Sequence, residues 1–200
     1  MQLEKHRWRL NHRIDALGEV LKEYRLGDTV GIDQFKVERV LIQLQIEWEH
    51  FVRAVVLDSA TGQFRSRSGP VVSRLPVRVK NREHASLILL SKYKKRSIEP
   101  DWYLPSEAIS AADKLSLSNY SQIAIQLGVS PWELEDLRHL RNFIAHRSNR
   151  AAKSVRSTGY IPKSERIIPC KICFDYTLGG MQRYERWIEF MKIVANGMVQ

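Results

Sequence analysis

The segment RNFIAHRSNR (residues 141–150) places an arginine, an asparagine and a histidine within an otherwise apolar helical pattern. A histidine titrates near neutral pH and can therefore act as a general acid or a general base. The forked donors of an arginine suit phosphate oxygens and developing negative charge. Arg141, Asn142 and His146 are therefore candidates for chemistry. The alternative is an ordinary solvated face of a helix.

A helix start signal precedes this segment. Ser130 suits an N-cap, Pro131 the first helical position and Glu133 a capping box, which predicts one helix from Ser130 through the whole segment. Successive residues turn by about 100°, so apolar and polar residues fall on opposite stripes of this helix. The apolar stripe is Leu134, Leu137, Leu140 and Ile144, and the polar stripe is His139, Asn142, His146 and Asn149.

Arg141 does not fit either stripe, because it lies about 140° around an ideal helix from His146, at the margin of the apolar stripe. A charged side chain at the edge of a core needs a partner, since burying it alone is unfavourable. One explanation is an acidic partner, with Glu47 and Glu49 as candidates. The other is that the helix packs against a second copy of itself, so that Arg141 of one subunit reaches toward His146 of the other.

The rest of the chain supplies the elements that would position these residues. Apolar residues recur at helical spacing over the first two dozen residues and again over 37–55, which predicts two long antiparallel helices. Further helices are expected over 83–95, 106–113, 118–127 and 178–198. Residues 60–82 read as a basic loop or short hairpin, and 151–177 as a basic loop with a β-prone end. The sequence thus predicts an all-α helical bundle with basic loop insertions, forming a single domain over residues 1–200.

The positive charge of the chain is regional. Residues 60–100 carry a net charge of +8 and residues 138–166 carry +7, which leaves −5 for the rest of a chain with +10 in total. Such regional excess is expected of a surface that meets RNA or DNA, although solvated loops on a basic protein would also show it.

Several other residues could carry chemistry but lack its usual pattern. Cys170 and Cys173 form a single CxxC in a β-prone segment, which predicts two ordinary reduced thiols over a metal or redox site. The remaining histidines have no ligand-like spacing and are predicted to lie on the surface. The tryptophans are predicted to pack in the core. These residues are His6, His12, His50 and His84, and Trp8, Trp48, Trp102, Trp132 and Trp187.

The stretch NYSQIAIQLGVSPWELEDLRHLRN (residues 119–142) resembles a helix-turn-helix in its local spelling, which keeps a DNA-binding regulator as an alternative. The residues that would face DNA include Glu133, Glu135 and Asp136, however. Their negative charge would repel phosphate, which disfavours this interpretation.

The run from Arg141 through Asn142 to His146 resembles the RX4-6H signature of the HEPN superfamily, with a polar residue after the arginine and a small residue before the histidine. The expected setting is also similar, because the HEPN fold is an all-α bundle around two long antiparallel helices with this motif on a late helix. The segments 60–82 and 151–177 resemble insertions that this fold does not require. The closest variety is the stand-alone bacterial HEPN protein of toxin and defence systems.

This resemblance implies a metal-independent endoribonuclease without a cofactor. RNA carries its own nucleophile, the 2′-hydroxyl, and the products would be a 2′,3′-cyclic phosphate and a 5′-hydroxyl. His146 would be the acid or base, Arg141 would stabilise the transition-state phosphate, and Asn142 would orient the phosphate or His146. The expected substrate-binding residues are His139, Arg138, Arg147, Arg150 and Asn149. The second interpretation is a catalytically silent HEPN-like protein that binds nucleic acid, a nucleotide or a partner.

The resemblance also implies a homodimer with a composite active site, and an antitoxin or defence-system protein as a further partner. No apolar run approaches the roughly 18 residues that a membrane-spanning helix needs, and the N-terminal residues are too charged for a signal peptide. We therefore expect a soluble, cytoplasmic protein with RNA as its substrate.

Overall fold

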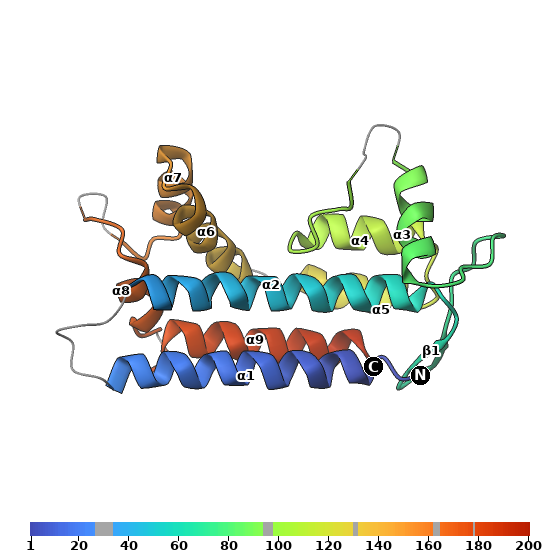
Figure 1. Cartoon of the computed structure of the whole chain (residues 1–200), viewed down its shortest axis with the longest axis horizontal. Helices are drawn as coiled ribbons and strands as arrows, with labels where there is room; N and C mark the ends of the chain where they lie inside the picture. Colours follow the sequence, from blue (N-terminus) through green and yellow to red (C-terminus); the bar gives the residue numbers. More distant parts are fainter. Residues whose placement is uncertain (27–33, 94–97, 130–131, 162–164, 178) are drawn as a thin grey trace. The chain divides into compact units, whose positions relative to one another are not determined.

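A computed structural model of the chain describes residues 1–26, 34–93, 98–129, 132–161, 165–177 and 179–200. These residues form nine helices and one two-stranded antiparallel sheet (Figure 1). The all-α prediction with a short hairpin is therefore confirmed. The elements are α1 (Glu4–Leu26), α2 (Gln34–Ser59), β1 (Phe64–Ser66), β2 (Gly69–Val71), α3 (Arg82–Ser91), α4 (Pro105–Lys114), α5 (Tyr120–Val129), α6 (Trp132–His146), α7 (Asn149–Ser157), α8 (Pro169–Phe174) and α9 (Arg183–Met198).

The chain divides into two compact units, each with its own core. Unit 1 comprises Met1–Asn11, Trp48–Ser130 and Lys192–Gln200, and unit 2 comprises His12–Glu47 and Pro131–Met191. Helices α1, α2 and α9 contribute residues to both units. The single domain expected over residues 1–200 stays a prediction.

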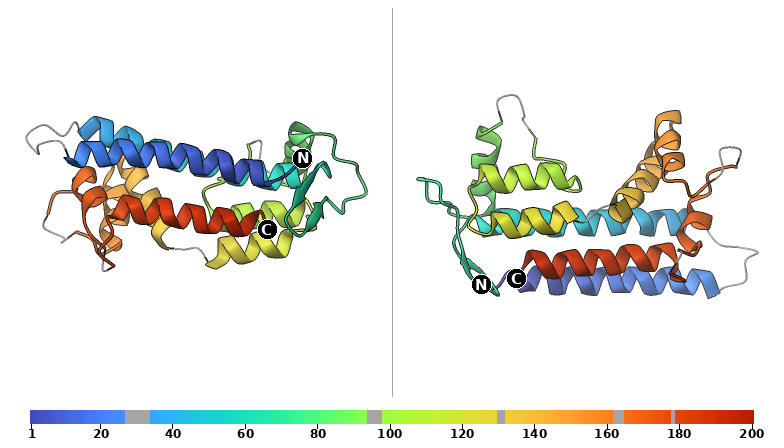
Figure 2. Two further views of the ribbon diagram at one scale, coloured as in Figure 1. Left: turned by 90° about the horizontal axis from the view of Figure 1, so that it is seen from below. Right: turned by 180° about the vertical axis from the view of Figure 1, so that it is seen from behind.

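In unit 1, the hairpin holds both ends of the chain. The strands β1 and β2 pair with Phe64 opposite Val71. The Leu3 amide donates to the Arg65 carbonyl at 2.9 Å, and the Arg67 amide donates to the Val199 carbonyl at 3.1 Å. Figure 2 shows the hairpin beside the two chain ends. The predicted basic loop over 60–82 thus contains a short hairpin with a structural role.

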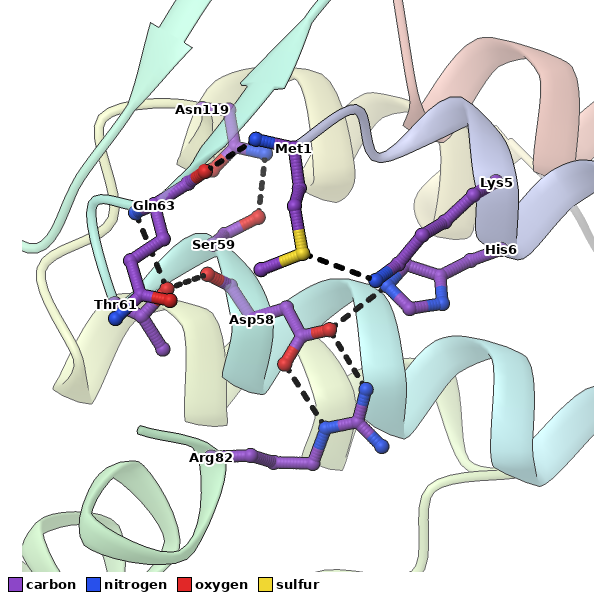
Figure 3. A network of polar contacts seen from close by, with 9 residues as sticks. All are labelled: Met1, Lys5, His6, Asp58, Ser59, Thr61, Gln63, Arg82 and Asn119. Carbon is purple, nitrogen blue, oxygen red and sulfur yellow. Dashed lines mark hydrogen bonds and ion pairs between the residues drawn. The ribbon is translucent and has the colours of Figure 1, made fainter. Parts of the chain in front are cut away.

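A buried polar network, centred on Asp58 near the end of α2, joins three elements of unit 1 (Figure 3). The Asp58 carboxylate accepts from His6 Nε2 at 2.8 Å and from Arg82 Nε and Nη2 at 2.9 and 2.7 Å. Burial alone would raise the pKa of Asp58, but the hydrogen bonds from His6 and Arg82 outweigh burial and lower the pKa to about 2. The start of α1, the end of α2 and the start of α3 are therefore linked through one carboxylate.

Two side-chain predictions in α1 are wrong. His6 was expected on the surface but is buried, and Trp8 was expected in the core but is 66% exposed. On an ideal helix, His6 lies within about 60° of both Leu3 and Leu10, whereas Trp8 lies about 160° from Leu10. The helical spacing of the buried leucines therefore explains both side chains.

Unit 2 contains the second half of α1, the first half of α2, the first half of α9, and α6, α7 and α8. Its α1 and α2 segments run antiparallel (Figure 1), and Arg13 donates to Glu47 across them at 2.7 Å. A Cβ atom at Gly18 would lie 2.9 Å from Ile188 Cδ1, so the glycine permits the close approach of α1 to α9. The largest fully buried side chains of this unit include Leu21, Leu41, Leu137, Leu140 and Trp187.

The expected loop over 151–177 is the main error of the sequence-based prediction. Helix α7 forms because the Ser148 side chain caps it by accepting from the Ala151 amide, and because Ala151 and Val155 bury one face. Helix α8 begins at Pro169, which suits the first helical turn, and it includes the CxxC segment that was predicted to be β-prone.

We expect Asp58→Asn to lower the free energy of unfolding near pH 7 by about 2 kcal/mol or more, because His6 and Arg82 lose a buried charged partner. The pKa of Asp58 is lowered from 3.8 to about 2, so its stabilising contribution is present above the higher value and is lost as pH falls through the lower one. Urea unfolding followed by circular dichroism measures the free energy of unfolding of the wild type and of the variant. The difference between these two free energies should become smaller below about pH 4. Asp113→Asn, which changes an exposed carboxylate in the same unit, is the matched control. A difference that stays constant down to about pH 2 would contradict the role of Asp58.

Candidate functional site

Helix α6 positions the candidate catalytic residues in unit 2. It is described from Trp132 onward, so the predicted cap at Ser130 and Pro131 lies outside the described residues. Leu137 and Leu140 are buried and fix the apolar face of the helix. The helix ends at His146 because Arg147 adopts a left-handed conformation with φ of 46°, and its amide donates to the Phe143 carbonyl at 2.8 Å. His146 is therefore the last helical residue, and the predicted continuation through residue 150 is wrong.

Arg141 is half-buried, and its positive charge has no carboxylate partner among the described residues. Its Nη1 atom donates to Asn142 Oδ1 at 3.0 Å, while its Nε atom is buried without a hydrogen-bond partner. Glu47, one of the two acidic partners suggested by the sequence, contacts Arg13 and Gln43 instead. The position of Arg141 is thus not explained by an ion pair within the described chain.

His146 and Asn142 lie on the same face of α6, as the helical spacing predicts. His146 is exposed, and Asn142 is half-buried beside Arg141. This geometry gives α6 one accessible imidazole and one partly desolvated guanidinium, and the guanidinium donates to the asparagine that lies on the face of His146. Groups of these types could transfer a proton and stabilise negative charge on a bound anion.

His139 lies seven residues, or about two helical turns, before His146 and is half-buried. Its Nε2 atom is 3.7 Å from Glu135 Oε1, and Arg138 donates to the same carboxylate oxygen at 2.7 Å. Burial and the positive charge of Arg138 lower the pKa of His139, although Glu135 opposes this effect. His139 is therefore biased toward its neutral form, which can accept a proton or a hydrogen bond.

The other predicted substrate-binding residues differ in their surroundings. Arg147 forms an ion pair with Glu38 on α2, and its guanidinium lies 5.0 Å from the centre of the Phe143 ring. Its charge therefore helps to fix the end of α6. Asn149 and Arg150 are exposed in the first turn of α7. The prediction that Asn149 continues the polar stripe of α6 is therefore wrong.

The two cysteines both lie in α8 and are both buried. Burial raises the pKa of the Cys170 thiol and raises that of Cys173 well above its ordinary value. Reactive cysteines have the opposite property, a lowered pKa in a partly exposed position. In the described part of the chain, no group of three or more histidine, cysteine, aspartate or glutamate residues is placed to hold a metal ion.

Each unit contains a cavity that the sequence did not indicate. The cavity in unit 1 has a volume of about 610 Å³ and is lined in part by Arg78 and Lys80 of the basic segment. The cavity in unit 2 has a volume of about 700 Å³ and is lined in part by Tyr160, Arg183 and Trp187. Its residues come from segments that are separated in the sequence and follow no fixed spacing, so only folding brings them together.

The fold and the geometry of α6 define an all-α protein with an Arg–Asn–His candidate site. Comparisons of the chain with protein-family models, with curated proteins and with solved structures found no match. Among the described helices, none combines the length and the apolar character needed to span a membrane.

We expect both thiols of the folded protein to react with Ellman's reagent at about pH 8 at least about tenfold more slowly than in guanidinium chloride, because burial disfavours the thiolate. The absorbance of the released thionitrobenzoate measures this rate. Addition of EDTA to the folded protein is the control, since acceleration by EDTA would indicate a bound metal. Two thiols that react as fast in the folded as in the unfolded chain would contradict the structural interpretation.

Proposed function

We propose that the protein is a metal-independent endoribonuclease of the HEPN type. The observation that supports this proposal is the state of Arg141, which is half-buried without a described carboxylate partner on the helix that presents an exposed His146. A partly desolvated, unneutralised arginine is suited to bind phosphate. The resemblance of the segment 141–146 to the RX4-6H signature supplies the reaction class.

In the proposed reaction, His146 accepts the proton of a ribose 2′-hydroxyl, and the 2′-oxygen attacks the adjacent phosphorus. The bond from phosphorus to the 5′-oxygen breaks, and a second imidazole protonates the leaving oxygen. The products are a 2′,3′-cyclic phosphate and a 5′-hydroxyl. Arg141 stabilises the extra negative charge on the phosphorane, and Asn142 orients the Arg141 guanidinium through its Oδ1 atom.

A dimer supplies the second imidazole in this proposal. His146 is exposed at the end of α6, where the same residue of a second copy can approach it. Two copies of His146 would then provide the base and the acid. A two-fold contact between α6 helices would also bring Arg141 of one copy toward His146 of the other and toward the shared substrate phosphate.

Exposed basic side chains would guide RNA in this proposal. Arg74, Arg78 and Lys80 are exposed in the basic segment of unit 1, and Arg150 is exposed in α7 of unit 2. Phosphate contacts are mainly electrostatic and tolerate irregular backbone. Arg82 and Arg67 of the same segment have structural roles, since they form ion pairs with Asp58 and Glu4.

The proposed biological role is a cytoplasmic toxin or antiviral defence effector that acts on RNA. Such an activity requires restraint in the cell, so an antitoxin or another defence-system protein is the proposed partner. This part of the proposal comes from the resemblance to stand-alone bacterial HEPN proteins.

We expect the purified protein to cleave total RNA in the presence of EDTA, and Arg141→Ala and His146→Ala to reduce the cleavage rate by at least about a hundredfold. Arg39→Ala and His12→Ala remove exposed residues of the same types elsewhere in unit 2 and serve as matched controls. Gel electrophoresis of labelled RNA measures the rate, and mass spectrometry identifies the product ends. Equal cleavage by all four variants would refute the proposed site, and a gel shift with duplex DNA without RNA cleavage would favour a DNA-binding regulator.

Subunit dilution tests the shared site. When wild-type chains assemble with a ninefold excess of His146→Ala chains, about one wild-type chain in ten has a wild-type partner. If both copies of His146 are required, activity per wild-type chain should fall about tenfold. The same excess of His12→Ala is the control and should leave activity unchanged. Unchanged activity with His146→Ala would show that each site needs only one copy of His146.

A further inference from the structure

The segment between β2 and α3 is held to the rest of unit 1 at both of its ends. At the first end, the Val72 amide donates to Ser118 Oγ at 3.0 Å, and the Ser118 amide donates to the Val72 carbonyl at 2.9 Å. At the other end, the Lys80 amide donates to His84 Nδ1 at 3.2 Å, and the Lys80 carbonyl accepts from Gln63 Nε2 at 3.1 Å. The segment is therefore positioned before any partner binds.

Three residues between these two ends have unpaired backbone groups. Val77, Arg78 and Val79 form no hydrogen bond with any other described residue. They lie outside the helices and strands, and the valines among them favour a strand. The segment leads into Asn81, whose backbone is extended. Water can satisfy these amides and carbonyls in the free protein, and a second extended chain can replace the water.

The same three residues line the cavity in unit 1. Its volume of about 610 Å³ is in the range of sites that bind ligands. Val72, Leu75 and Val77 give part of the lining an apolar character. Val72 is 38% exposed and Val77 is 53% exposed, so the cavity opens to solvent and presents apolar surface there. The unpaired backbone thus belongs to a wall that another chain can reach.

The charge around this cavity is positive. Arg74 precedes the unpaired residues, Arg78 lies among them and Lys80 follows them. These three side chains are exposed, and none forms an ion pair or a hydrogen bond within the part of the chain that the structure describes. No aspartate or glutamate occurs in the sequence from Ser59 to Arg82. The three cations therefore favour a partner that carries carboxylates.

We propose that this cavity binds an extended, acidic peptide segment of a partner protein. The peptide adds as a strand beside residues 77–79 and exchanges backbone hydrogen bonds with them. Its apolar side chains contact Val72 and Val77. Its carboxylates pair with Arg78 and Lys80. Successive side chains of a strand point to opposite faces, so the peptide alternates acidic and apolar residues. RNA would offer phosphates to the cations, but it has no backbone amides and would leave the valines exposed.

This binding is independent of the proposed ribonuclease activity, because the cavity belongs to unit 1 and the Arg141 motif belongs to unit 2. The cations of the cavity are also among those that would guide RNA in the proposed function. A peptide bound there would therefore compete with RNA for these cations.

Fluorescence anisotropy of labelled synthetic peptides, titrated with the full chain, tests the proposal. The probe is EVEVEVE with blocked ends, and EEEEVVV has the same composition without the alternation. We expect the alternating peptide to bind at least about tenfold more tightly, because only this peptide forms a strand with one acidic and one apolar face. Backbone N–H groups point alternately to the two edges of a strand. N-methylation of either the valines or the inner glutamates of EVEVEVE should therefore weaken binding much more than N-methylation of the other set.

Val77→Asp removes an apolar contact and adds a repelling charge, and Arg78→Glu reverses a cation. Each change should weaken the binding of EVEVEVE by about tenfold or more, whereas Arg78→Lys should retain it. Leu87→Asp and Arg65→Glu make the same changes at exposed residues of unit 1 that do not line the cavity, and both should bind like the wild type. Thermal melts establish that the variants are folded, and Arg78→Glu alone decides if Val77→Asp is not.

A single-stranded 2′-O-methyl oligoribonucleotide, which lacks the attacking hydroxyl, tests RNA as the other occupant. If it binds in a manner that depends on Val77 and Arg78 while EVEVEVE does not bind, the surface is an RNA site and the proposal is overturned. A dissociation constant for EVEVEVE weaker than about 1 mM, equal affinity for EEEEVVV, or wild-type affinity in Val77→Asp and Arg78→Glu would also overturn it. Arg141→Ala should bind the peptide like the wild type, so loss of cleavage and loss of peptide binding are separable.

Discussion

The carboxylate of Asp58 shows the constraint on which unit 1 depends, namely that a buried charge must be paired. Asp58 accepts hydrogen bonds from His6 and Arg82 and thereby joins α1, α2 and α3. Glu99 follows the same rule: burial would raise its pKa, but bonds from Arg53, Ser86 and Trp102 lower the pKa to about 2. Each of these two carboxylates is thus stabilised among packed helices by hydrogen bonds from residues of other segments.

Unit 2 follows this rule at some positions and departs from it at others. Arg13 pairs with Glu47, and Arg147 pairs with Glu38. Arg183 pairs with Asp175. Arg141 has no described carboxylate partner, and its buried Nε atom has no described acceptor. Local rules of stability are broken most often at functional sites, because the missing partner is supplied by a substrate, ligand or subunit. Arg141 therefore marks the candidate active site on α6.

The sequence predicted the features that depend on periodic apolar residues and missed those that depend on distant partners. The long helices repeat their apolar residues over many turns, so their class was clear. Helix α7 buries only Ala151 and Val155, and α8 is a six-residue helix rich in apolar residues that also favour strands. The buried state of His6 could have been inferred from its place between Leu3 and Leu10. Its contact with Asp58, 52 residues away, could not.

The candidate site was only partly predictable for the same reason. Arg141, Asn142 and His146 lie within six residues, so helical geometry alone fixes their relative directions. The cavity in unit 2 requires the turn after α7, the turn before α9 and α9 itself to meet, and no local pattern encodes that meeting. One hydrogen bond links the two features, since the Tyr160 hydroxyl in the cavity wall donates to Asp136 on α6. The helix that carries the motif is thus held in part by a residue that also lines the cavity, and that contact joins positions 24 residues apart in the sequence.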